Sequence, residues 1–166
     1  MKYDVLHALL KEKVPPAELE EAENLALEVL KENPSVYGTV FSALRTHYKT
    51  THTQKEPLIT GLALVHCLSV GDLSRFTALA EETTRADKAD VRKSPYVEYA
   101  LQLADVLFQK KKLGFEAADA PSPEFLPLLR TINSAAAPKN KHGDEKEGER
   151  NPAICTKIAQ CLENEF

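Results

Sequence analysis

Apolar side chains recur along most of this chain at the three- and four-residue spacing of an amphipathic α-helix. The rows with the clearest spacing begin at Leu19, Val36, Leu73 and Phe125. Two further segments, Leu58–Val70 and Tyr96–Phe108, are apolar nearly all round, so we expect them to form central helices that are buried on several sides. No alternating pattern typical of a β-strand competes with these rows.

A polar residue followed by proline marks the start of several of these segments. The pairs are Asn33-Pro34, Ser94-Pro95, Ser122-Pro123 and Asn151-Pro152. The polar side chain can accept a hydrogen bond from an unpaired backbone N–H, and proline fits the first helical position because it has no N–H to leave unpaired. Gly71-Asp72 is the clearest tight turn, with glycine ending one helix and Asp72 capping the next.

These signals predict an all-α fold of stacked antiparallel helical hairpins, with about eight helices and little or no β-structure. The expected ranges are 2–12, 16–33, 35–51, 57–70, 72–85, 95–113, 123–134 and 152–164. Most connections are short, so consecutive helices should fold back on one another. Small residues at Gly61, Ala63, Ala78 and Ala80 should let the fourth and fifth helices approach each other closely.

The segment 135–150 differs from the rest of the chain. It carries four basic and four acidic residues and no large apolar side chain, so burial cannot offset the entropy lost on ordering it. We therefore expect a helical-repeat domain over 1–134, a charged flexible loop over 135–150 and a C-terminal helix within 151–166.

The composition fits a single domain with a real core, since 43% of the 166 residues are hydrophobic. The net charge is −4 and no stretch forms a basic stripe, so direct sequence-specific nucleic-acid binding is not expected. The three cysteines contain no C-x-x-C pair, and no apolar run is long enough for a leader or a membrane span. These features favour a reducing, cytoplasmic location without membrane contact.

No motif of catalysis or phosphate binding is present, neither G-x-G-x-x-G, a P-loop, G-x-S-x-G nor H-E-x-x-H. His47 and His52 are five residues apart and do not share a helical face. Adjacent His66 and Cys67 point about 100° apart on a helix, which favours a packed thiol beside a hydrogen-bonded histidine. The glutamates of the second helix are expected on its solvated face: Glu18, Glu20, Glu21, Glu23 and Glu28. We therefore expect no catalytic residue, metal or cofactor; a small α-helical enzyme or ligand-binding bundle is the alternative from another class.

Several segments resemble the small PCI-type subunits shared by the signalosome, the proteasome lid and translation initiation factor three. LLKEKVPPAELEEAENLALEVLKENPSVYGTVFSALRTHY is similar to the start of the k-subunit family of eukaryotic translation initiation factor three, and PLITGLALVHCLS and YALQLADVLFQKKKL continue that likeness. Gly61–Ser69 and Arg75-Phe76, with Tyr96 and Tyr99, resemble the smallest PCI subunits of the proteasome lid. The resemblance extends over about residues 5–115. Family members normally end in a winged-helix module, of which the helix in 151–166 would be a truncated start.

The resemblance implies a non-catalytic scaffold subunit that packs beside other PCI-type subunits, such as subunits l and e of the initiation factor, and reaches the small ribosomal subunit through the complex. The alternative complexes are the lid of the 26S proteasome and the signalosome. Exposed aromatic and basic residues near helix ends are natural anchors for such contacts, although each aromatic can equally cap the internal core. The candidate interface residues are Tyr48, Tyr96, Lys110, Lys111, Lys112, Phe115 and Phe166.

Overall fold

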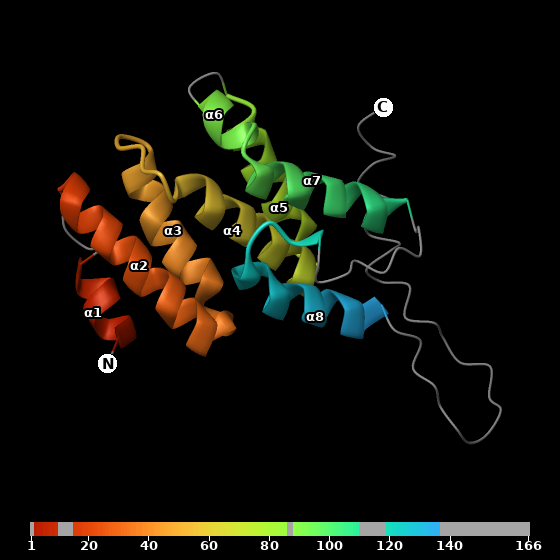
Figure 1. The fold of residues 1–166 in the computed structure, drawn as a ribbon, viewed down its shortest axis with the longest axis horizontal. Coiled ribbons are helices and arrows are strands. Elements are labelled where there is room, and N and C mark those ends of the chain that lie inside the picture. The colour runs from red at the N-terminus through yellow and green to blue at the C-terminus, as the bar shows by residue number, and fades with distance from the viewer. Residues whose placement is uncertain (1, 10–14, 86–87, 110–118, 137–166) are drawn as a thin grey trace.

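The computed structural model describes residues 2–9, 15–85, 88–109 and 119–136. Every regular element in those ranges is helical (Figure 1). The α-helices are α1 (Lys2–Leu9), α2 (Pro16–Glu32), α3 (Tyr37–Tyr48), α4 (Glu56–Val70), α5 (Leu73–Thr83), α6 (Ala89–Arg92), α7 (Pro95–Phe108) and α8 (Leu126–Ala136). Two 3-10 turns, η1 (Pro34–Val36) and η4 (Pro123–Phe125), lead into α3 and α8. The predicted all-α stack of helical hairpins is confirmed.

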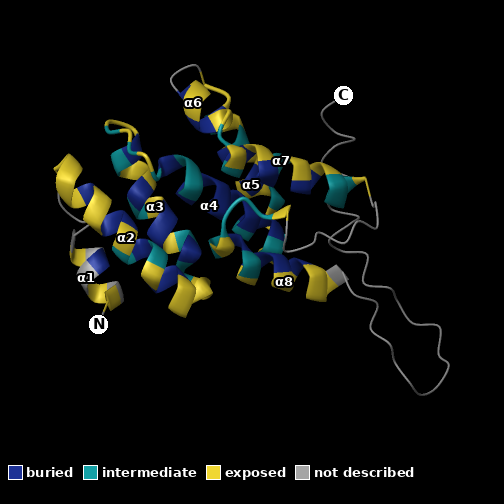
Figure 2. Ribbon diagram, in the orientation of Figure 1, coloured by how far each residue is buried: buried dark blue, intermediate teal, exposed yellow. Residues whose placement is uncertain are grey.

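Helix α4 lies at the centre of this stack and contacts α3, α5, α7 and α8 (Figure 1). Ten of its fifteen residues are buried, and they lie on every side of the helix. The expectation for Leu58–Val70 is therefore confirmed. The neighbouring helices together cover α4, and Figure 2 shows much of α4 in the dark blue of buried residues.

Helix α7 makes the most extensive contact with α4, but it is buried on one side only. Glu98, Gln102 and Asp105 are exposed, and Figure 2 shows exposed stretches along α7. The expectation that Tyr96–Phe108 is buried on several sides is wrong, because these three polar residues recur at helical spacing and turn one face to water.

The predicted caps are confirmed at the two tightest joints. Gly71 ends α4 in the left-handed conformation with φ 73°, and the Asp72 carboxylate accepts a hydrogen bond from the backbone N–H of Arg75 at 3.0 Å. Ser94 caps α7 by accepting from the N–H of Val97 at 3.3 Å. The expected cap at Ser122 is wrong, because its hydroxyl bonds the Glu124 carboxylate instead.

Some predicted boundaries moved where local turns interrupt the helical spacing. The range 35–51 divides into η1 and α3, and α3 ends at Tyr48. Helix α6 was not predicted, because four residues are too few to show periodicity. Helix α8 continues to Ala136, two residues into the expected loop. The predicted helix 152–164 and the remainder of the 135–150 loop lie outside the described residues.

Gly61 allows a close helix contact, but its neighbour is α7 rather than the predicted α5. A Cβ atom at Gly61 would lie 2.8 Å from the backbone oxygen of Tyr96. Ala63 and Ala78 do face the space beside α5, where they line a small cavity. The close approach predicted between α4 and α5 is therefore found, at Gly61, between α4 and α7 instead.

Candidate functional site

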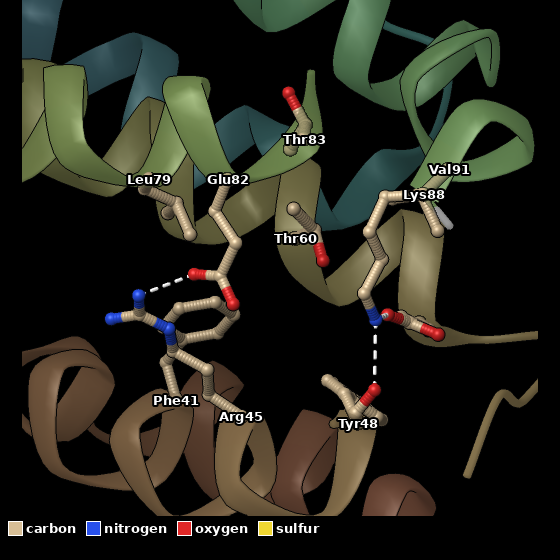
Figure 3. A pocket seen from close by; sticks show the side chains of 10 residues that line it. Phe41, Arg45, Tyr48, Thr60, Leu79, Glu82, Thr83, Lys88 and Val91 are labelled. Atoms are coloured by element: carbon tan, nitrogen blue, oxygen red, sulfur yellow. Dashed lines mark hydrogen bonds and ion pairs between the residues drawn. The ribbon is translucent and has the colours of Figure 1, made fainter. Parts of the chain in front are cut away.

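Two small cavities lie between α3 and α5, with α4 as their floor. Phe41, Arg45 and Leu79 line both of them. The first also reaches Lys88 and has a volume of about 20 Å³, close to the space of one water. Figure 3 shows α3 on one side of this cavity and α5 on the other. The second is lined by His66 and has a volume of about 50 Å³, enough for a few waters.

Two arginines cross the space between α3 and α5. Arg45 on α3 forms an ion pair with Glu82 on α5, which Figure 3 marks with a dashed line. Arg75 on α5 reaches in the opposite direction. Its Nη2 donates to the carbonyl of Gly38 at 3.1 Å and to the hydroxyl of Ser42 at 2.9 Å. The two helices are thus joined by polar side chains at both cavities.

His66 and Cys67 do not form a nucleophilic pair in this arrangement. The His66 ring stacks on Tyr37 with centroids 4.7 Å apart. Burial lowers the pKa of His66, and the nearby Arg75 guanidinium lowers it further, so the imidazole is neutral at pH 7. Burial raises the pKa of Cys67 to about 11, which keeps the thiol protonated. The packed thiol is confirmed, but the His66 ring is stacked on Tyr37 rather than hydrogen-bonded to a described residue.

Five polar residues, four of them buried, join separate segments of the chain: Glu23, Tyr48, Thr53, Glu56 and Lys88. We call them the Glu56 cluster. The Tyr48 hydroxyl donates to Glu23 Oε1 at 2.7 Å, and the Thr53 hydroxyl donates to the same carboxylate oxygen. Lys88 pairs with Glu56 and donates to the Tyr48 carbonyl at 2.8 Å (Figure 3). Burial, followed by the charge of Glu23, raises the pKa of Tyr48. Through these bonds the cluster links α2 to the end of α3 and to the 49–55 turn, and it links Lys88 to the end of α3 and the start of α4.

The sequence reasoning missed this cluster. Glu23 was expected on the solvated face of α2 but is completely buried, whereas the four other glutamates named with it are exposed. A signal was present, because Glu23 lies four residues after Leu19 and three before Ala26, on the apolar row itself. A carboxylate on such a row requires an internal donor, and Tyr48 and Thr53 provide two.

The candidate interface residues are not brought together. Tyr48 is 3% exposed and hydrogen-bonded inside the core, so the prediction that it is a surface anchor is wrong. Its place at the last residue of α3 suggested exposure, but the 49–55 turn folds over it. Tyr96 is half-buried, with its ring stacked on Phe125 at 6.4 Å. Lys110, Lys111, Lys112, Phe115 and Phe166 lie outside the described residues.

The remaining histidines and acidic groups form no metal centre in the part of the chain that the structure describes. His52 is exposed, and its Nδ1 lies 3.0 Å from Glu56 Oε2, while His47 shares no ligand set with it. Within the same ranges, none of the helices combines the length and the apolar character needed to cross a bilayer.

Comparisons with known proteins add no assignment to this geometry. No family model, curated protein or solved structure matches the chain. The likeness to PCI-type subunits therefore stays an expectation from the residues quoted for it. The described features that bear on function are the packing around α4, the Glu56 cluster, and the space between α3 and α5.

Proposed function

We propose that this protein is a non-catalytic structural subunit of a large cytoplasmic complex built from PCI-type subunits. The observation that supports this most is how the buried polar groups are used. Inside the chain, Glu23 accepts hydrogen bonds from Tyr48 and Thr53, and Glu56 pairs with Lys88. The cavities between α3 and α5 have the size of one to a few waters. Such an interior stabilises a stack of helices. The function of the protein would then depend on the contacts that its outer faces make with partners.

Those outer faces are long and suited to lateral contacts. Stacked helical hairpins bury one face of each helix within the stack and expose the other, and proteins of this kind use the exposed faces to bind partners. Here α2 presents Glu18, Glu20, Glu21 and Glu28 to solvent, and α8 presents Arg130 and Thr131. The surface therefore differs in charge from one face to another, as selective neighbours in a complex require.

Eukaryotic translation initiation factor three is the first candidate complex, because the likeness to its subunit k extends from the first helices to α7. In that role the protein would pack beside subunits such as l and e and reach the small ribosomal subunit through them. Part of this likeness, the K-E-N break at Lys31–Asn33, lies on exposed residues. Exposed positions constrain residue identity less than packed ones do, so this part of the likeness is less specific than one between packed residues.

The lid of the 26S proteasome is the second candidate, and one observation favours it. The residues that resemble a lid subunit lie where α4, α5 and α7 meet. Gly61 lies directly against the Tyr96 backbone, Phe76 packs edge-on against Phe108 at 6.3 Å, and Tyr99 packs edge-on against Phe125 at 5.7 Å. These contacts constrain both the size and the shape of the side chains, so a likeness here is more specific than one at the surface.

Density-gradient sedimentation of the tagged full chain from its own cells separates these candidates. Comigration and co-purification with small ribosomal subunits supports the initiation-factor role, and comigration with 26S proteasomes supports the lid role. Mass spectrometry of the purified complex then identifies the neighbours. A chain that sediments only as a free monomer contradicts both roles and favours the small enzyme or ligand-binding bundle.

A further inference from the structure

We propose that the cavity beside Arg75, between α3 and α5, receives a single carboxylate side chain from a neighbouring subunit. This inference rests on the proposed function, since it assumes a neighbour within a complex. It concerns the larger of the two cavities, which is lined by Gly38, Ser42, His66, Cys67 and Arg75 among others. We call it the Arg75 cavity.

Arg75 is held in place but is not saturated. A guanidinium has five N–H donors, and Nη2 uses two of them on the Gly38 carbonyl and the Ser42 hydroxyl. No carboxylate of the described residues forms an ion pair with Arg75. The side chain is also exposed. An incoming carboxylate would therefore meet a cation whose position is already fixed, with N–H donors on Nη1 and Nε still available.

The neighbouring arginine, Arg45, differs from Arg75 because it has an acidic partner within the chain. Arg45 crosses the same space, and its charge is matched by Glu82. The only nearby acid with a described link to Arg75 is Asp72, and its carboxylate accepts from the backbone N–H of Arg75 as a helix cap. The Arg75 cavity thus combines a guanidinium that forms no ion pair with a described carboxylate and a neutral His66 ring. Asp72 is the acid whose charge also acts on His66, and its carboxylate is engaged as the helix cap. This charge pattern fits an acidic partner residue.

The dimensions limit the occupant to a side chain. A volume of about 50 Å³ holds a few waters, which a carboxylate and its last methylene can displace. Gly38 leaves room for the Arg75 guanidinium to lie against α3, because a Cβ atom there would lie 2.9 Å from Arg75 Nη1. An aspartate or glutamate on a partner helix that lies across α3 and α5 satisfies both the size and the charge.

The experiment begins with the tagged full chain carrying a photo-crosslinking amino acid at Ala78, which is exposed on α5 and lines the cavity. Crosslinking in cells and peptide mapping identify the partner segment. Arg75→Glu should reduce recovery of that partner about tenfold, and reversing the mapped acidic residue to arginine should restore it. Arg92→Glu, at an exposed position at the end of α6, is the matched control and should leave recovery unchanged.

Altering the partner alone distinguishes loss of the proposed contact from a structural effect of Arg75→Glu on this chain. Changing the mapped acidic residue to its amide leaves this chain intact and should give the same loss as Arg75→Glu. If wild-type chain joins no complex, the proposed function fails. If it joins one but the crosslinked segment has no acidic residue, or the partner amide binds as tightly as before, the Arg75 inference is overturned while the proposed function stands.

Discussion

Replacing Lys88 by methionine tests the role of the Glu56 cluster in stability. The Lys88 side chain is 9% exposed and that of Glu56 is 3% exposed, so the substitution removes the buried cation from a buried carboxylate. The exposed His52 ring stays beside the other carboxylate oxygen, at 3.0 Å. Breaking a buried pair in this way costs about 3–5 kcal/mol. The Tyr48 carbonyl also loses its donor. At about 2–4 °C per kcal/mol for a chain of this size, the midpoint of thermal unfolding should fall by about 6–20 °C.

The measurement is urea and thermal unfolding followed by circular dichroism at 222 nm. Lys88→Met combined with Glu56→Gln should recover a large part of the lost stability, because the uncompensated charge is then gone. Lys93→Met, at an exposed lysine five residues away, should change the free energy of unfolding by less than about 0.5 kcal/mol. A loss below about 1 kcal/mol for Lys88→Met, or a double variant as unstable as the sum of the two single ones, would refute the reasoning.

Three further predictions concern the packing and the thiol. Gly61→Ala should lower the free energy of unfolding by about 1–3 kcal/mol in urea, because the new Cβ meets the Tyr96 backbone, which cannot move aside cheaply; an unchanged midpoint would contradict this. Phe125→Ala should cost about 3–5 kcal/mol, since this ring is completely buried between α7 and α8; a loss under 1 kcal/mol would mean that the ring is not core. Cys67, with the two C-terminal cysteines replaced by serine, should react with iodoacetamide at pH 8 only after unfolding, because its pKa is raised to about 11 and the thiolate is scarce below that pH; rapid labelling of the native protein would exclude the burial described.

The features that sequence predicted well are those decided within a few residues. The turn at Gly71-Asp72 and the cap at Ser94 depend on one side chain and the adjacent backbone, so their identity is sufficient to predict them. The burial of α4 followed from a composition that is apolar nearly all round. The failure at Ser122 has the same local scale, because a glutamate two residues on competed for its hydroxyl.

The features that sequence did not predict depend on residues far apart in the chain. Tyr48 and Glu23 meet across 25 positions, and Lys88 and Glu56 across 32. The position of Tyr48 at a helix end gave no indication of burial, because burial there depends on where the next turn folds. The Arg75 cavity was not predicted either, because the Arg75-Phe76 pair indicated only a resemblance to a proteasome-lid subunit.

The central position of α4 links the stable core to the exposed surface. A helix that is apolar all round must be enclosed by several others, and its polar first residue, Glu56, is buried with it. That carboxylate requires partners, and Lys88 and His52 supply them. Further along the same space, α3 and α5 do not close over α4, and among the described residues Arg45 and Arg75 cross the opening. The opening therefore differs from the core in one respect that bears on function: its cation Arg75 has no internal carboxylate among the described residues, so binding a partner's acid there would not require any internal contact to break.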